Sequence, residues 1–344
     1  MTCQIPIQAV RCMVEFEKVV LMLNNYDIYV ASYSKTGGIY HYKMVDGVLE
    51  LINITGMDRP MYMIVSKNKM NILLREVMKG KESGVVAYDM DADGKLTNPS
   101  DVLSTKGEVA CHLTEVDGAM YCVNYISGSV IKLPDKLAVH SGNSIHPKRQ
   151  QSSHPHYVCA SPDGKYILVT DLGLDKIFVY TKNLELHSIT DMPAGHGPRH
   201  LVCHPDEKRV YCANELGSTL SELAYEDGVL TLKNTVSTIP PGYHGANAVA
   251  AIRYNKDKIY VTNRGHNSIV VMDENLRIEN LFSCGGEEPR DIWIMDDVII
   301  CTNQFSDKVC FISAQDGSLL EEIKLEAPLC VVCVKNEKFG GKAR

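Results

Sequence analysis

The sequence predicts an all-β fold, a seven-bladed β-propeller closed by pairing of its N- and C-terminal strands in one blade. Three observations predict it: a strand–turn–strand pattern recurs along the chain, helical periodicity is nearly absent, and one copy of the pattern is split between the two ends. The copies follow one another at the spacing of about 40 to 50 residues that is typical of four-stranded propeller blades.

Six copies of the pattern lie between the chain ends. Each has an apolar segment rich in Val, Ile and Tyr, a polar turn such as Pro162-Asp163-Gly164 or Asn255-Lys256-Asp257, and further apolar segments, which indicates strands joined by turns. The first two copies are weaker than the other four. The copies begin at Pro60, Ala110, Pro155, Pro198, Ala246 and Pro289.

The seventh copy is split. Residues 328–332 resemble a first strand with nothing after it, whereas residues 27–33 and 38–43 resemble later strands that lack a first. Pairing of these segments would close the ring and leave only short, protected edges. We therefore expect a propeller over residues 25–337 and a tail over 338–344. Residues 1–24 lie outside the repeat, as an N-terminal extension or as the product of an upstream start with Met22 as the initiator.

Composition narrows the class of protein. Among 344 residues, 45% are hydrophobic and 22% are charged, so a sizeable core can form. The net charge of −7, with Lys and Arg scattered, does not favour a nucleic-acid partner. No apolar run approaches the roughly 20 residues that span a bilayer. Arg11, Glu15 and Lys18 interrupt the segment where a signal peptide would need an apolar stretch. We expect a cytoplasmic protein without a membrane partner, a monomer or a weak homo-oligomer.

Cysteine usage does not indicate a metal or a disulfide framework. The twelve cysteines, without a signal peptide, are interpreted as small buried hydrophobic residues kept reduced. The one CxxC runs from Cys330 to Cys333, and residues three apart on a strand face opposite sides. No HExxH spacing is present. We therefore predict no metal and no cofactor.

Equivalent positions of a propeller form rings around its channel, and two such rings vary in charge. A position with a purely structural role should look alike in every copy, so these rings are where we expect function. The alternative is a wet channel whose polar lining has no catalytic purpose. The first ring, at the start of the innermost strands, is Met61, Cys111, His156, Arg199, Asn247, Arg290 and Leu329. The second, after the end of the second strands, is Glu76, Tyr125, Leu172, Glu215, Arg264 and Gln304, with Tyr33 from the split blade.

The charged ring residues suit acid–base chemistry on an anionic substrate. Arg199, Arg264 and Arg290 can hold phosphate or carboxylate, or stabilise a developing oxyanion. His156 can titrate near neutral pH, and Glu215 can act as a base. The partner predicted from these residues is a small anionic substrate.

Other polar residues near the rings complete the predicted site. His154 lies two residues before His156, and either histidine could face the channel. His200 and His266 follow closely on key arginines, where they could orient them or be buried structural histidines. The residues predicted to contact the substrate are Arg290, His200, His266, Asn247, Tyr125, Glu76 and Gln304.

At these residues the sequence resembles the seven-bladed lactonase family, which includes bacterial 6-phosphogluconolactonases and the fungal carboxy-muconate cyclase. The resemblance covers residues 27–335. It departs from the family at Ala110, where Pro is usual, and at Arg75, where Asn is common. The matching motifs are Asn124-Tyr125-Ile126-Ser127-Gly128-Ser129-Val130, His154-Pro155-His156, Ser161-Pro162-Asp163-Gly164-Lys165, Asp171-Leu172-Gly173, Gly197-Pro198-Arg199-His200, Asn214-Glu215-Leu216 and Asn263-Arg264-Gly265-His266-Asn267-Ser268-Ile269.

The resemblance implies an active site of one histidine, one glutamate and two arginines. In this sequence they fall on His154 or His156, Glu215, Arg199 and Arg264. The leading hypothesis is metal-free hydrolysis of a sugar-acid lactone, 6-phospho-D-glucono-1,5-lactone to 6-phosphogluconate, a step of carbohydrate metabolism in the pentose phosphate pathway. The alternatives are a carboxymuconate-type lactonising or cyclising enzyme, and a non-catalytic propeller that binds a small anion or a protein partner.

Overall fold

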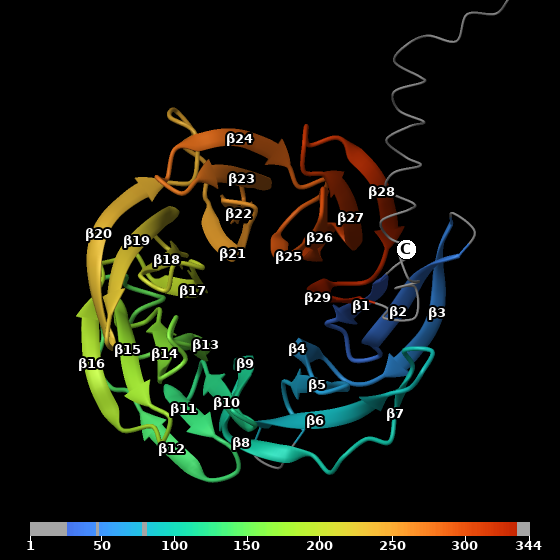
Figure 1. Ribbon diagram of the computed structural model, residues 1–344, viewed down its shortest axis with the longest axis horizontal. Helices are drawn as coiled ribbons and strands as arrows, with labels where there is room; N and C mark the ends of the chain where they lie inside the picture. The colour runs from blue at the N-terminus through green and yellow to red at the C-terminus, as the bar shows by residue number, and fades with distance from the viewer. Residues whose placement is uncertain (1–25, 46–47, 78–80, 336–344) are drawn as a thin grey trace, which may run out of the picture.

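A computed structural model describes residues 26–45, 48–77 and 81–335. Seven antiparallel sheets stand in a ring around a central axis (Figure 1). The predicted all-β propeller and its seven blades are confirmed. The predicted extension over 1–24 and tail over 338–344 lie outside the described residues.

Blades 1 to 3, numbered in chain order, comprise thirteen strands. Blade 1 has five, and β8 pairs with β6 beside β7. The strands of blade 1 are β4 (Pro60–Ser66), β5 (Lys69–Leu74), β6 (Glu82–Met90), β7 (Leu96–Thr97) and β8 (Leu103–Glu108). Those of blade 2 are β9 (Ala110–Val116), β10 (Ala119–Asn124), β11 (Ser129–Lys132) and β12 (Lys136–Val139), and those of blade 3 are β13 (Pro155–Ala160), β14 (Tyr166–Asp171), β15 (Lys176–Thr181) and β16 (Leu186–Asp191).

Blades 4 to 6 have four strands each, in sequence order from the axis outward. Blade 4 contains β17 (Pro198–Cys203), β18 (Arg209–Asn214), β19 (Thr219–Glu226) and β20 (Val229–Ser237). Blade 5 contains β21 (Ala248–Asn255), β22 (Lys258–Arg264), β23 (Ser268–Asp273) and β24 (Ile278–Ser283). Blade 6 contains β25 (Pro289–Met295), β26 (Val298–Asn303), η1 (Gln304–Ser306), β27 (Lys308–Ser313) and β28 (Leu319–Lys324). Within the described residues, no helix is long and apolar enough to cross a membrane.

Blade 7 joins the two ends of the described chain. Its innermost strand, β29 (Pro328–Lys335), pairs with β1 (Tyr26–Ser32), which β2 (Gly38–Val45) and β3 (Val48–Gly56) follow. The pairing is antiparallel, with Val331 opposite Val30. The predicted closure of the ring by the split copy is therefore confirmed.

The core consists of apolar clusters between neighbouring blades. Leu168 and Val179 of blade 3, for example, pack with Leu201 and Val210 of blade 4. Burying one such side chain contributes about 1.5–3 kcal/mol, so the contacts between blades hold the ring together. Cys330 and Cys333 illustrate the alternation of a strand, because they belong to two different clusters.

The innermost strand of every blade carries the same irregularity near its start. In six blades one residue of that strand is left without a partner in the neighbouring strand, which is the geometry of a β-bulge. In blade 5 both Ala250 and Ala251 lack a partner, and the N–H of Ala251 donates to the hydroxyl of Thr262 as that of Asp291 does to Thr302, so Ala250 corresponds to Arg290. A bulge re-aims the side chain of its extra residue. Six of the seven bulge residues line the pocket described below. The bulge residues are Met61, Cys111, His156, Arg199, Ala250, Arg290 and Leu329.

Candidate active site

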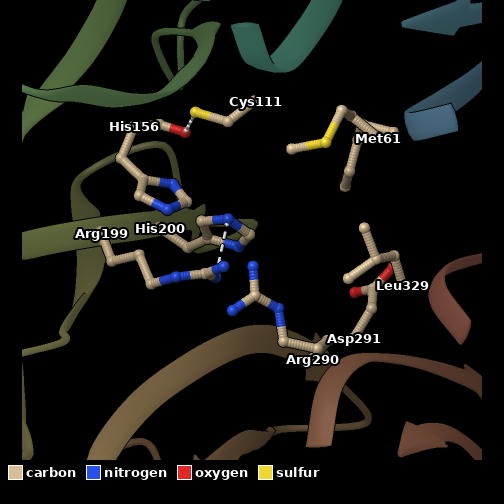
Figure 2. Close-up of a pocket in the computed structure, with 9 residues that line it drawn as sticks. Met61, Cys111, His156, Arg199, His200, Arg290, Asp291 and Leu329 are labelled. Atoms are coloured by element: carbon tan, nitrogen blue, oxygen red, sulfur yellow. Dashed lines mark hydrogen bonds between the residues drawn. The ribbon is translucent and has the colours of Figure 1, made fainter. Parts of the chain in front are cut away.

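A small pocket lies at the axis, where the bulge residues converge. Its cavity has a volume of about 40 Å³. Figure 2 shows His156, Arg199 and Arg290 on one side, with Met61 and Leu329 across the opening. The pocket is lined by Met61, Tyr62, Cys111, His156, Arg199, His200, Arg290, Asp291 and Leu329.

The strand pairing corrects the predicted first ring at blade 5. In blade 4, Pro198 pairs with Asn214 and Arg199 is the bulge residue. In blade 5 the corresponding pair is Val249 with Asn263, so Ala250 and not Asn247 occupies the ring position. The Asn247 amide instead donates to Ser218 and Asn263, at 3.0 Å and 3.2 Å.

The second ring is corrected at blade 1. Pro60 pairs with Leu74, so Leu74 ends the second strand and Arg75 takes the ring position predicted for Glu76. The Arg75 guanidinium lies 5.9 Å from the centre of the Tyr33 ring. Glu76 is the counter-ion of Arg75 and of Arg59, at 3.4 Å and 3.2 Å.

Glu215 lies at the centre of the charged part of the site. It follows β18, and only 2% of its surface is exposed. One carboxylate oxygen, Oε1, lies 2.7 Å from Nη2 of Arg149. The other, Oε2, lies 3.0 Å from Nε of Arg199 and 2.9 Å from Nη2 of Arg264. Burial alone would raise the pKa of Glu215, but Arg264, Arg199 and Arg149 outweigh it and hold this pKa well below its usual value.

The two buried arginines on Glu215 are oriented by further bonds. Nη1 of Arg199 donates to the carbonyl of Ala250 at 2.8 Å and to Nε2 of His200 at 2.9 Å. Nη2 of Arg264 donates to the carbonyl of Val249 at 3.1 Å. Both guanidinium groups are therefore fixed before a ligand arrives, which is the preorganisation that transition-state stabilisation needs.

Arg290 is held much less firmly. Its nearest carboxylate is Glu288, with Oε1 3.9 Å from Nη1, and it donates no hydrogen bond to any of the residues that the structure describes. Burial, followed by repulsion from Arg264 and Arg199, lowers the pKa of Arg290 to about 9. Burial and Arg264 lower that of Arg199 to about 10.

His156 is the histidine that faces the pocket. Within the described part of the chain, its buried Nδ1 has no hydrogen-bond partner. Burial, and then the positive charge of Arg199, hold its pKa well below 6.5, so the ring is neutral at pH 7. His154 instead stacks on Tyr125, with ring centres 4.3 Å apart, and its Nδ1 donates to the Tyr125 carbonyl at 2.9 Å.

Three other residues predicted to contact the substrate, Tyr125, His266 and Gln304, make separate contacts. The Tyr125 hydroxyl accepts a hydrogen bond from Arg149 at 3.1 Å, at the edge of the site. Nδ1 of His266 bonds to Ser268 at 2.8 Å, and His266 is not among the residues that line the pocket. Gln304 is anchored through its N–H, which donates to the Glu288 carbonyl at 3.1 Å.

Two functional candidates were missed in the sequence. Arg149 lies in the long connection 140–154 between β12 and β13, which no other blade repeats. The fully buried Gln150 holds this connection, because Nε2 donates to the Leu172 carbonyl at 2.8 Å and Oε1 accepts from the His146 N–H at 2.9 Å. Glu288, with a φ of 58°, immediately precedes β25 and contacts Arg264 at 3.3 Å.

A layer of contacting rings follows the bulge residues along the inner strands. His112 lies 4.4 Å from Tyr62 and 3.9 Å from Tyr157, and Tyr157 lies 4.7 Å from His200, between ring centres. Burial holds the pKa values of His112 and His200 well below 6.5. Two members of this uncharged layer, Tyr62 and His200, line the pocket.

Comparison with known proteins gives a consistent result. The family described as "Lactonase, 7-bladed beta-propeller" matches residues 27–334. An uncharacterized protein of Staphylococcus epidermidis is 30% identical over 319 residues, covering 84% of this chain and 92% of that protein.

Two solved structures are similar over nearly the whole ring. A protein from Lactobacillus plantarum superposes with a TM-score of 0.80 at 26% identity, covering 90% of this chain and 99% of that one. A periplasmic gluconolactonase of Pseudomonas aeruginosa has the same TM-score and coverage at 24% identity, which shows the shared fold.

Proposed function

The chain belongs to the seven-bladed β-propeller lactonase family, and we propose that it hydrolyses 6-phospho-D-glucono-1,5-lactone to 6-phosphogluconate in its central channel. The observation that carries this proposal is the pair of fixed guanidinium groups, Arg199 and Arg264, that share Glu215 beside the neutral His156. Together they supply donors for an oxyanion and an acceptor for a proton.

The arginines act on the carbonyl of the lactone. When water attacks that carbon, the carbonyl oxygen becomes negatively charged, and the guanidinium hydrogens of Arg199 and Arg264 stabilise it. Donors already fixed at the place where charge develops give the largest single contribution in many acyl-transfer enzymes. The ring C–O bond then breaks, and the former ring oxygen leaves as a hydroxyl.

His156 is the group we assign to proton transfer. His156 lines the pocket and its imidazole is neutral, so the ring can accept the proton of the attacking water and return it to the leaving oxygen. Glu215 is less suited to this task because both its oxygens are engaged by arginines and its pKa is strongly lowered. Its role in the proposal is to hold the arginines.

The direct test uses purified protein and freshly prepared 6-phospho-D-glucono-1,5-lactone. We expect hydrolysis well above the spontaneous rate, with 6-phosphogluconate as the product. Arg199→Ala should lose about 10²- to 10³-fold in kcat, the usual effect of removing one oxyanion donor. Arg277→Gln, at an exposed position, is the matched control. The proposal fails if the wild-type rate does not exceed the background.

A further inference from the structure

The site contains more positively charged side chains than negatively charged ones. Three of its four arginines contact Glu215, and Glu288 contacts the remaining one and also Arg264. His156, His200 and His112 are neutral because their pKa values are strongly lowered. Four arginines against two glutamates leave a formal excess of two positive charges. The arginines are Arg149, Arg199, Arg264 and Arg290.

The nearest other charges do not remove this excess. Arg253 is paired with Asp291, which lines the pocket, with Nη2 and Oδ1 2.6 Å apart. Arg59 and Arg75 are paired with Asp58 and Glu76. Each of these groups is neutral as a whole, so the excess stays at the pocket.

The excess is concentrated between Arg199 and Arg290. Their guanidinium groups face each other across a small gap in Figure 2. The N–H groups of the Arg290 guanidinium donate no hydrogen bond to the described residues. The closest carboxylate oxygen, from Glu288, is 3.9 Å away. Arg199 is buried and the side chain of Arg290 is 26% exposed, and two like charges held together in such a partly buried place are unfavourable unless an opposite charge joins them.

The dimensions of the pocket restrict what can enter. A volume of about 40 Å³ admits a few water molecules or one compact group, since one water needs roughly 10–15 Å³ by this measure. A sugar-sized ligand therefore extends beyond this cavity. Met61 and Leu329 form an apolar wall opposite the arginines, so donors reach the bound group from one side.

We propose that the space between Arg199 and Arg290 is a subsite for a compact, doubly charged oxyanion group, above all a phosphate monoester. The guanidinium fork of Arg290 is free to match phosphate oxygens, Arg199 adds positive charge beside it, and the dianion matches the excess charge. Resting on the proposed function, the subsite takes the phosphate of the substrate while Arg199 and Arg264 keep the lactone carbonyl, and Arg290 is the residue that determines this specificity.

The subsite is tested first without any reaction, by isothermal titration with inorganic phosphate at pH 7.5. We expect binding that Arg290→Gln weakens about 10- to 100-fold and Arg290→Lys weakens less, because lysine keeps the charge but loses the fork. Arg277→Gln should bind as wild type, and acetate, a monoanion, should bind at least about tenfold more weakly than phosphate. Thermal unfolding of each variant shows that it is folded. No phosphate binding, equal binding by Arg290→Gln, or equally tight acetate binding would each overturn the subsite.

The second arm separates the subsite from the proposed reaction. Arg290→Gln should lose at least about tenfold more kcat/KM on 6-phospho-D-glucono-1,5-lactone than on unphosphorylated D-glucono-1,5-lactone. Equal losses on both lactones would overturn the role of Arg290 while leaving lactone hydrolysis intact. Phosphate binding that depends on Arg290, in a protein with no lactone hydrolysis, would overturn the proposed function while leaving the subsite intact.

Discussion

The two sides of the pocket have the same backbone and opposite chemistry. Each side is built from bulge residues at the start of innermost strands. In what we call the cationic arc these are His156, Arg199 and Arg290, whereas in the apolar arc they are Met61, Cys111 and Leu329. A repeated fold thus supplies equivalent positions, and the site arises where the side chains at those positions stop being alike.

The second ring follows this division only in part. Glu215 and Arg264 lie over the cationic arc, and Glu215 is bound to Arg199 from the first ring. Tyr33 and Arg75, from the blades of the apolar arc, pack on each other, and Arg75 is paired with Glu76. Both sides of the second ring therefore carry charge, and over the cationic arc that charge is connected to the first ring through Glu215.

The largest expected effect comes from removing the shared counter-ion of the cationic arc. Glu215→Ala leaves three arginines facing one another, so we expect kcat/KM to fall about 10³-fold or more. Loss of one partner of a buried ion pair should also lower the free energy of unfolding by about 3 kcal/mol. Steady-state kinetics and urea unfolding measure both, with the exposed Glu279→Gln as control. A kcat/KM within tenfold of wild type would show that Glu215 is not needed to hold the arginines in place.

Removing the proton acceptor should have the next largest effect. His156→Asn keeps a polar side chain of similar size but cannot act as a base at neutral pH, so we expect kcat to fall about 10²- to 10³-fold. KM should change little, because the arginines stay in place. His187→Asn, on an outer strand, is the control, and equal kcat values for the two variants would exclude His156 from the chemistry.

A carboxylate placed on the apolar arc should offset the positive charge of the opposite side of the pocket. Leu329→Glu brings a carboxylate opposite Arg290, where it would compete with an anionic ligand. We expect the affinity for 6-phosphogluconate to fall about tenfold or more, with a smaller effect from the uncharged Leu329→Gln. Equal affinities of the two variants, measured by titration calorimetry, would show that charge is not what distinguishes the arcs.

The pH dependence of the rate should be set by His156. This residue acts when neutral, and its pKa is held below 6.5, so kcat/KM should keep its plateau as pH falls through 6.5. A guanidinium group keeps its proton over the working range, so the affinity for 6-phosphogluconate should stay level from pH 7.5 to 9. Kinetics from pH 5.5 to 7.5 and titrations from pH 7.5 to 9 measure the two quantities. A rate that halves near pH 6.5, or an affinity that falls about tenfold by pH 9, would contradict these assignments.

The smallest effect is expected at Arg149. Its side chain is 42% exposed, so solvent screens its pair with Glu215. Arg149→Ala should raise KM about three- to fivefold and leave kcat within a factor of two, consistent with an exposed ion pair of up to about 1 kcal/mol. A loss of kcat/KM as large as that of Glu215→Ala would contradict this peripheral role of Arg149.

The repeat made most of this architecture predictable. Seven copies of one pattern, with the split copy at the ends, were sufficient to predict seven blades and their closure, because strand periodicity and turns recur in each blade. Ring membership followed for His156, Arg199 and Arg290, where a Pro precedes the bulge residue and marks the register.

Residues that the repeat does not mark were misplaced or missed. Asn247 was predicted in the ring held by Ala250 because no Pro marks the bulge of blade 5. Glu76 was aligned in place of Arg75 because Leu74 stands where other blades end with Asn or Asp. Arg149 belongs to a connection without an equivalent in other blades, and only tertiary contacts bring it to Glu215.

The most direct test of the account is the rate of proton release from freshly prepared 6-phospho-D-glucono-1,5-lactone in a pH-stat at pH 7, for wild-type protein and for Arg264→Met. Arg264 lies over the cationic arc, bound to Glu215 and to the Val249 carbonyl. We predict a wild-type rate far above spontaneous hydrolysis and a loss of about 10²-fold or more in the variant. A wild-type rate equal to the spontaneous one, or equal rates for the two proteins, would contradict it.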